Sequence, residues 1–459
     1  MSAERPRRIL LLAYEFPPSP SPQSLRWVYF ARELALLGNE VHVLAPRLPR
    51  QSGGLPELPD SVKVHRCFAG PVMGLLAWRD RRRVEALQGT AGADGADGDG
   101  NPGHSSGDRA PTPPEELNWK GRLWHAGLNW KGRLFYGFQS LLGWLLFPDQ
   151  RGEWRPWARR RLVGLLAEIR PDVVISSHEP ATTLELGLLA RRAGFPWIVD
   201  IGDPVLAPYT PRRWRRRSLR LEREACRGAG HVIVTTQKAA ELLASRHDLP
   251  PGRISVLTQG FDHRYKAPVP APAGPFADDR LELLYTGSFY GFRRHQPLLR
   301  AVLATPGVRL NIASIRVPPD VEQASQAAPG SVRLLGFLPH LQALALQRRA
   351  DVLVNLANDD PCQVPGKLYE YLGAGRPILH VGGGEADVVS QLLQRTGHGQ
   401  DCPNDADAIA RVLAALAAAR PAPSFPVDER TLPHAWATSA ARLDAIIRGL
   451  LADAAPPGP

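Results

Sequence analysis

The order of apolar and amphipathic segments is the feature that most restricts what this chain can fold into. Ile9–Ala13 is continuously apolar, as in a parallel strand buried on both faces, and SLRWVYFARELALLG after it has helical periodicity. EVHVLAP is the next strand candidate. The same order returns in PDVVISSHEP, ATTLELGLLARRAG and PWIVDIGDP, and again in HVIVTTQ and KAAELLASRH. This alternation predicts a parallel α/β sheet with helices on both faces.

A second set of strand candidates follows the proline-rich stretch YKAPVPAPAGPFADD, which is typical of an interdomain linker. These candidates are RLELLYTGSFYG, VRLNIAS, VRLLGFL, DVLVNLA and RPILHVGG, and the amphipathic helix WATSAARLDAIIRGLLADA ends the chain. A chain of 459 residues is also too long for one core. We therefore predict two doubly wound, Rossmann-like domains facing a cleft, at residues 1–265 and 280–459, joined by a linker at 266–279. The terminal helix is expected in the second domain.

Two unusual segments interrupt the first domain. Residues 87–116 nearly lack large apolar side chains and are expected to be a disordered insertion. The copies LNWKGRLWHAG and LNWKGRLFYGF follow, and their period of three helical turns would place both on one face. Together with the apolar stretch after them, they predict an amphipathic membrane-contact segment at 117–148. The arginine run RRWRRRSLRLERE, usually a solvated helix face, is expected to contact anionic headgroups, which attract each basic residue by about 1 kcal/mol.

Composition favours partners that carry phosphate. Lys+Arg number 56 against 45 Asp+Glu, a net charge of +11 that suits a nucleotide, nucleic acid or an anionic membrane surface. No recognisable nucleic-acid module is present, which makes nucleic acid the weaker alternative. The four cysteines have neither CxxC nor metal-ligand spacing, so neither a disulfide framework nor a zinc site is indicated, and a reducing cytoplasm is expected. Without a signal-peptide pattern or a stretch of about 20 apolar residues, we expect peripheral association with the inner face of the plasma membrane.

The helix predicted in CQVPGKLYEYLGAGRP contains a lysine where a cation is unfavourable. Lys367 falls in the first turn, where the helix already has four unpaired N–H groups and about half a unit of positive charge. Two interpretations remain open. Lys367 is either a solvated surface lysine or the counter-ion of a diphosphate at the helix N-terminus, with Glu370 on the same face accepting from ribose hydroxyls.

This segment resembles the donor-site helix of family 4 glycosyltransferases, retaining enzymes of GT-B fold, especially those that assemble bacterial surface polysaccharides. Their motif is a glutamate, seven residues and a second glutamate, which matches Glu370 and implies that it binds the nucleotide ribose. The first glutamate falls at Cys362, where backbone amides of residues 363–366 are expected to substitute. The implied donor-binding residues are Gly287, Val364, Pro365, Gly366, Lys367 and Glu370.

Other segments are similar to the same family. VISSHEP resembles the strand whose terminal histidine, here His178, faces the reaction centre, although a lone histidine is more often simply packed or solvated. YTGSFYGFRRHQ resembles the loop whose arginine meets the donor phosphates, which makes Arg293 or Arg294 the candidate. The first strand–loop–helix unit and VDIGDP resemble acceptor-side elements, although Asp before Pro is also a turn signal. The implied acceptor-side residues are Ser21, Gln23, Arg26, Asp200 and Asp203.

The resemblance implies a retaining glycosyltransferase that moves a sugar from a nucleotide-diphosphate donor to a lipid-linked or glycan acceptor in bacterial cell-surface glycan biosynthesis. The resemblance further implies that Lys367 and an arginine stabilise the leaving diphosphate without a metal or another cofactor. The alternative is a non-catalytic relative of GT-B fold, a scaffold or sugar-nucleotide sensor, which Cys362 favours. An epimerase or phosphorylase of the same fold lacks motif support.

Overall fold

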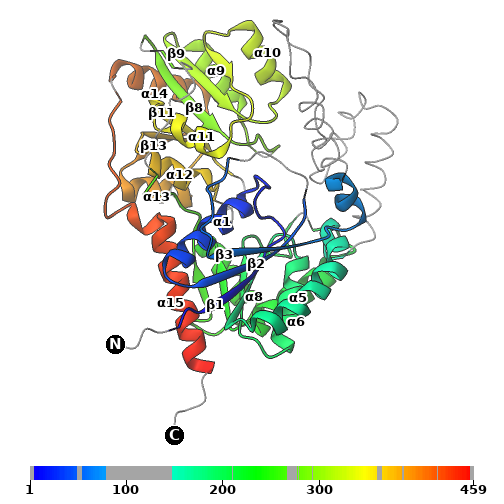
Figure 1. Cartoon of the computed structure of the whole chain (residues 1–459). Helices are drawn as coiled ribbons and strands as arrows, with labels where there is room; N and C mark the ends of the chain where they lie inside the picture. The colour runs from blue at the N-terminus through cyan, green and yellow to red at the C-terminus, as the bar shows by residue number, and fades with distance from the viewer. Residues whose placement is uncertain are drawn as a thin grey trace, which may run out of the picture.

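The computed structural model describes residues 5–48, 54–78, 147–208, 210–265, 276–277, 279–291, 293–358, 364–384, 387–420 and 422–454. They form two α/β domains, the lower and the upper in Figure 1. The predicted disordered insertion, the predicted membrane-contact segment up to residue 146, most of the predicted linker and Cys362 lie outside the described residues.

The N-terminal domain is built on a seven-stranded parallel sheet with the order β3-β2-β1-β4-β5-β6-β7. Its strands are β1 (Arg8–Leu12), β2 (Glu40–Pro46), β3 (Val62–Cys67), β4 (Val173–His178), β5 (Trp197–Ile201), β6 (His231–Val234) and β7 (Ile254–Val256). The central strands are buried along nearly their whole length, because helices cover both faces of the sheet. The strand order reverses between β1 and β4, so ligands are expected at the carboxyl ends of these two strands.

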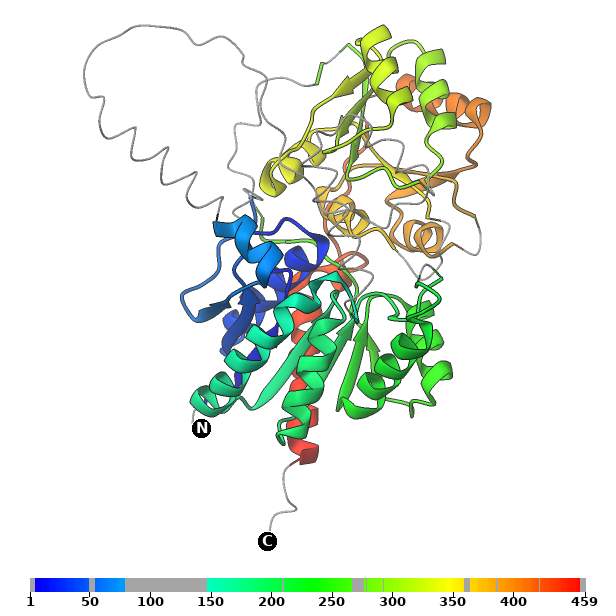
Figure 2. The same cartoon turned by 90° about the vertical axis from the view of Figure 1, so that its right-hand side faces the viewer.

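Helices cover the two faces of this sheet in separate layers. One layer holds the short helix η2 (Gln150–Trp154), α5 (Arg155–Ile169), α6 (Thr182–Arg192), α7 (Arg215–Gly228) and α8 (Gln237–His247). Figure 2 shows α5 and α6 in front of the sheet. The opposite layer holds α1 (Pro22–Leu36) and α15 (Trp436–Ala454), with η3 (Leu432–His434) leading into α15.

Helix α15 corrects the prediction that the terminal helix belongs to the second domain. It runs beside the N-terminal domain (Figure 1, red), where Leu443 and Ile447 are buried in the same core as α1. Trp436 stacks on Tyr29 of α1 with ring centroids 5.3 Å apart and planes at 8°. Asp444 accepts from Asn39 at 2.9 Å. The sequence pattern shows that this helix has an apolar face, but not which domain that face covers.

The C-terminal domain has a six-stranded parallel sheet with the order β10-β9-β8-β11-β12-β13. Its strands are β8 (Leu281–Thr286), β9 (Val308–Ala313), β10 (Val332–Leu334), β11 (Val352–Leu356), β12 (Ile378–Val381) and β13 (Gly399–Cys402). Its helices are α9 (Gln296–Ala304), α10 (Pro319–Ala327), α11 (His340–Gln347), α12 (Lys367–Ala374), α13 (Val388–Thr396) and α14 (Ala406–Ala418). The order reverses between β8 and β11, as in doubly wound folds. The prediction of two doubly wound domains is confirmed.

Candidate functional site

Helix α12 begins with a buried lysine. Its N-cap residue, Gly366, provides no side-chain cap, and the N–H groups of Leu368 and Tyr369 donate to the carbonyls of Pro365 and Gly366. The Lys367 Nζ atom is buried and has no hydrogen-bond partner in the part of the chain that the structure describes. It lies 3.5 Å from the ring centroid of Tyr285 and 5.6 Å from that of Tyr371. The rings stabilise the cation only partly, so this position is suited to an anion.

The charge on Lys367 is unfavourable in the protein as it stands. Burial lowers the pKa of the Lys367 amine well below its usual 10.5, and the positive charge of Arg293 lowers it further. Glu370 acts in the opposite direction but does not offset the loss of solvation. A bound diphosphate would stabilise the charged amine, because it places negative charge beside both cations.

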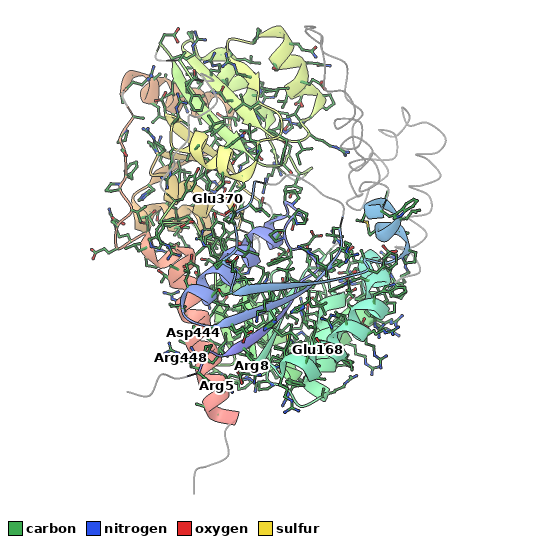
Figure 3. All side chains as sticks on the ribbon, in the orientation of Figure 1. Arg5, Arg8, Glu168, Glu370, Asp444 and Arg448 are labelled. Atoms are coloured by element: carbon green, nitrogen blue, oxygen red, sulfur yellow. The ribbon has the colours of Figure 1, made fainter. Side chains whose placement is uncertain are left out.

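Glu370 lies one turn after Lys367, where the two domains meet (Figure 3). Its Oε2 atom accepts a hydrogen bond from Gln347 Nε2 at 3.3 Å. Its Oε1 atom is 3.8 Å from Nδ1 of His340, and Nε2 of that histidine is 3.2 Å from the hydroxyl of Tyr29 in the other domain. Sequence reasoning missed His340 and Gln347, because only the folded chain brings α11 beside α12.

The structure separates the two arginines that the sequence leaves as alternatives. Arg293 is buried, with Nε donating to Asn358 Oδ1 at 2.9 Å and Nη1 donating to the carbonyl of Ser288 at 3.0 Å. Its charge lowers the pKa of Lys367. Arg294 is exposed, and its carbonyl accepts from Asn404 at 2.8 Å. The geometry therefore favours Arg293 as the arginine of this site.

The remaining predicted donor residues surround the start of α12. The residues directly before the helix are Val364, Pro365 and Gly366. A Cβ added to Gly366 would lie 3.3 Å from Cγ of Gln259, in the segment after β7 of the N-terminal domain. Gly287 follows β8 with φ +106°, and a Cβ added there would lie 3.8 Å from Cδ of Lys367. Glycines at these two positions keep the backbone close to the lysine stem and to the other domain.

His178 ends β4 at the edge where ligands are expected in the N-terminal domain. It is 5% exposed, and its Nδ1 atom is buried with no hydrogen-bond partner among the described residues. Its carbonyl accepts from Gln23 Nε2 at 2.8 Å, while the Oε1 atom of Gln23 is likewise buried and without a partner in the described chain. The structure thus brings His178 and Gln23 together and leaves each with one unsatisfied polar atom, as expected for groups that bind a hydroxylated ligand.

Arg26 and Asp200 correct the acceptor-side prediction. Both side chains are fully buried, and two N–H···O bonds of 3.0 Å join the guanidinium to the carboxylate. Asp200 also accepts from Trp27 Nε1 at 3.0 Å, and Arg26 donates to the carbonyl of Thr258 at 3.0 Å. This ion pair fixes α1 against β5 and the segment after β7, so its members are not available to orient an acceptor hydroxyl.

Ser21 and Asp203 complete the predicted acceptor-side set. Ser21 is the N-cap of α1, and its Oγ atom accepts from the backbone N–H of Ser24 at 3.1 Å. Its contact is therefore structural. Asp203 is partly exposed and follows Gly202, where an added Cβ would lie 2.5 Å from Gln23 Nε2. Of these two residues, Asp203 is the one beside the His178–Gln23 pair.

Helix α12 also contacts the N-terminal domain along its length. A Cβ added to Gly373 would lie 2.5 Å from the ring of Phe261, and Gly366 lies against Gln259, as described above. The segment 258–261 therefore separates the start of α12 from α1, whose Arg26 bonds to Thr258. The candidate donor helix and the carboxyl edge of the first sheet are thus held together by one short segment.

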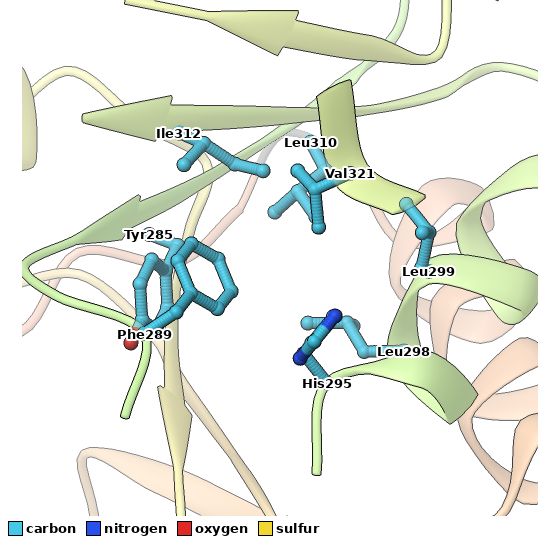
Figure 4. A pocket seen from close by; sticks show the side chains of 8 residues that line it. All are labelled: Tyr285, Phe289, His295, Leu298, Leu299, Leu310, Ile312 and Val321. Carbon is cyan, nitrogen blue, oxygen red and sulfur yellow. The ribbon is translucent and has the colours of Figure 1, made fainter. Parts of the chain in front are cut away.

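A small pocket inside the C-terminal domain is a different feature (Figure 4). Its lining is Tyr285, Phe289, His295, Leu298, Leu299, Leu310, Ile312 and Val321. The lining is almost wholly apolar, and the ring of His295 is bonded to Asp320 at 3.0 Å. These walls offer no cation to a diphosphate, so the pocket belongs to the domain core rather than to the candidate site.

No group of three or more His, Cys, Asp or Glu side chains within the described ranges is arranged to hold a metal ion. In the same part of the chain, no helix is both long enough and apolar enough to cross a membrane. The residues that surround Lys367 and His178 are suited to an anionic, hydroxylated ligand.

A protein-family model matches part of the chain. The model of Glycosyltransferase Family 4 matches residues 123–265, in the N-terminal domain. No curated protein sequence matches the chain.

Solved structures match over the whole chain. Sucrose-phosphate synthase from Thermosynechococcus elongatus is 15% identical with a TM-score of 0.63, and the match covers 97% of this chain and 100% of that one. AviGT4, a glycosyltransferase involved in avilamycin A biosynthesis, is 13% identical with a TM-score of 0.51, covering 97% and 98%. A UDP-N-acetylglucosamine 2-epimerase is 12% identical with a TM-score of 0.51, covering 99% and 98%. The chain is thus similar to Glycosyltransferase Family 4 within its N-terminal domain, and it shares a two-domain GT-B fold with solved glycosyltransferases along its whole length.

Proposed function

We propose that this protein is a glycosyltransferase that moves a sugar from a nucleotide-diphosphate donor to a lipid-linked or glycan acceptor, with retention at the anomeric carbon. The observation that carries the proposal is the buried Nζ of Lys367, which has no hydrogen-bond partner among the described residues and stands at an uncapped helix N-terminus. A cation held in this way has little structural use, whereas a diphosphate leaving group requires positive charge that is already in place.

Each side of the site has its own task in this mechanism. Lys367 and Arg293 stabilise the negative charge that develops on the departing diphosphate, and the positive end of the α12 dipole adds to this stabilisation. Glu370 accepts from the ribose hydroxyls of the nucleotide. His178 Nδ1 and Gln23 Oε1, for which the described residues supply no partner, hydrogen-bond the transferred sugar or the incoming hydroxyl.

The finer parts of the proposal rest on sequence. Retention and a role in bacterial cell-surface glycan synthesis follow from the resemblance of VPGKLYEYLGAGRPIL to family 4 enzymes of that type. Action at the cytoplasmic face of a membrane is supported by the arginine run that starts α7. The similar fold of an epimerase shows that the fold alone does not choose the reaction.

A donor screen followed by a transfer assay tests the proposal. Thermal shifts with UDP-, GDP- and ADP-sugars should reveal the donor, since a ligand at 100 times its Kd stabilises the folded state by about 2.7 kcal/mol. The identified donor is then incubated with lipid extract and with soluble glycans, and both nucleotide release and anomeric configuration are measured. Sugar transfer supports the enzyme. Tight nucleotide binding without release, across donors and acceptors, favours the scaffold or sensor.

A further inference from the structure

Exposed apolar side chains gather on one flank of the N-terminal domain. The helical segment 71–78 lies beside the start of α5 in both Figure 1 and Figure 2. The backbone N–H groups of Val72 and Met73 donate to the carboxylate of Glu153 at 2.9 and 3.0 Å, which fixes this segment against η2. The ring of Phe68 meets that of Trp157 edge to face, with centroids 5.1 Å apart.

Four side chains make up this aromatic flank, and all are well exposed. Phe68 is 43% exposed, Leu75 50%, Trp78 44% and Trp157 44%. Leu75 and Trp78 are three residues apart on one helical segment and so share a face. Phe68 packs on Gly74, where an added Cβ would lie 2.1 Å from its ring, so the two halves of the flank adjoin. A contiguous apolar surface of this kind marks an interaction site.

Arginines border the aromatic flank. Arg155, Arg159 and Arg160 are exposed around Trp157 on α5. Arg155 is 3.1 Å from the carboxylate of Glu185, and burial raises the pKa of this carboxyl although the charges of Arg155 and of Arg217 in α7 oppose the shift. The arginines at the start of α7, at positions 215–217, are likewise exposed.

The described residues that flank the gap at 79–146 are Trp78 and Phe147. Trp78 belongs to the aromatic flank, and the ring of Phe147 has its centroid 4.3 Å from the guanidinium carbon of Arg217 in α7. The sequence between them carries the two LNWKGRL copies, which again combine Trp, Lys and Arg with apolar residues.

We propose that the aromatic flank and its bordering arginines form a docking surface for an anionic lipid bilayer. Aromatic rings enter the headgroup region while arginines remain among the phosphates, so the mixture on this flank complements a negatively charged bilayer. The inference rests on the proposed function, because a lipid-linked acceptor lies in such a bilayer. A second copy of the chain would bring like-charged arginines together, which opposes self-association through this surface.

Vesicle co-sedimentation of the full chain tests the surface. Phosphatidylcholine vesicles with phosphatidylglycerol should bind the protein, and pure phosphatidylcholine vesicles should not. Arg159→Gln/Arg160→Gln should lower the partition coefficient about 30-fold, which corresponds to about 1 kcal/mol per arginine. Trp78→Ala/Trp157→Ala should weaken binding to the phosphatidylglycerol-containing vesicles even at high salt, because it removes the apolar contact.

Matched controls lie on the C-terminal domain. Arg300→Gln/Arg411→Gln removes two exposed arginines, and Leu303→Ala/Ile315→Ala removes side chains 45% and 61% exposed. Both should leave the partition coefficient unchanged. The docking surface is contradicted if the flank variants have the same partition coefficient as the wild type. It is also contradicted if the control variants lose as much binding as the flank variants. Flank-dependent dimerisation in light scattering, without vesicle binding, overturns it in favour of a second copy.

Nucleotide affinity measured on the same samples separates this inference from the proposed function. Protein that binds nucleotide and transfers sugar to a soluble acceptor but does not sediment with vesicles contradicts the docking surface alone. Protein that sediments in a flank-dependent way but binds no nucleotide supports the surface and contradicts only the proposed function.

Discussion

Replacing Lys367 with methionine should separate the function of this residue from its place in the fold. Methionine keeps a stem of similar length, and the Nζ atom it removes has no hydrogen-bond partner in the described chain. No donor or acceptor is therefore left unpaired, and the free energy of unfolding should change by less than about 1.5 kcal/mol. Breaking a buried ion pair would instead cost about 3 to 5 kcal/mol.

Lys367→Met should affect the rate of sugar transfer much more than it affects the stability of the fold. A hydrogen bond from a charged group contributes about 1.5 to 3 kcal/mol to binding, and removing one group that stabilises transition-state charge lowers kcat by about 10² to 10³. We therefore expect Lys367→Met to lower nucleotide release by about that factor while the melting temperature shifts by a few degrees. Lys63→Met, at an exposed lysine of β3, is the matched control and should change neither.

The number of protons bound by the protein gives a second, independent measure of the role of Lys367. Because the pKa of Lys367 is lowered in the folded protein, the unfolded chain binds more protons between that pKa and 10.5. Wild-type stability should therefore rise with pH in this window, and the methionine variant should lack that component. Diphosphate binding favours the charged amine, so nucleotide binding at such pH should take up protons.

Calorimetry in two buffers with different ionisation enthalpies measures this uptake. The wild type and Lys63→Met should take up the same number of protons, and Lys367→Met should take up fewer. If the methionine variant transfers sugar at the wild-type rate and takes up protons as the wild type does, Lys367 does not meet the diphosphate and the donor-site assignment is wrong.

Three further substitutions test the rest of the site. His178→Ala should slow transfer by about 10² to 10⁴ and leave nucleotide affinity unchanged, and equal losses in both would contradict its place beside the sugar. Asp200→Ala should destabilise the protein in urea by about 3 to 5 kcal/mol by leaving Arg26 buried and unpaired, whereas lost transfer at full stability would restore the acceptor-side interpretation. A double-mutant cycle of Tyr29→Phe and His340→Gln on nucleotide affinity should give a coupling of about 0.5 to 3 kcal/mol, and additive effects would show that this interdomain contact does not reach the donor site.

The fold could be predicted wherever strands are buried on both faces. β1 is continuously apolar after Arg8, and β4 opens with the apolar run of residues 173–175, so the pattern alone identifies them. β3 and β7, the two edges of the first sheet, were not among the strand candidates. β7 is only partly buried along its length, and its sequence therefore lacks the continuous apolar run from which a buried strand can be predicted. How apolar a strand must be depends on whether other elements cover it, and this is known only from the folded chain.

Some residues of the candidate site could likewise be predicted from the sequence, and the contacts of others could not. Lys367 was found because it conflicts with the local charge of its own helix, a conflict visible within a few residues. The contact of Glu370 with His340 joins two helices, and the ion pair of Arg26 with Asp200 joins residues 174 positions apart. Sequence similarity pointed to Asp200 but could not show that an arginine already neutralises it.

The return of α15 to the first domain has a consequence for synthesis of the chain. The sheet of that domain leaves the ribosome first, yet part of its core consists of Trp436, Leu443 and Ile447 from the last helix. Until translation ends, α1 has an uncovered apolar face, and a nascent chain in this state is exposed to aggregation and to chaperones. A stop codon before residue 436 would therefore damage the half of the protein that was made earliest, and the N-terminal domain should not fold properly when expressed alone.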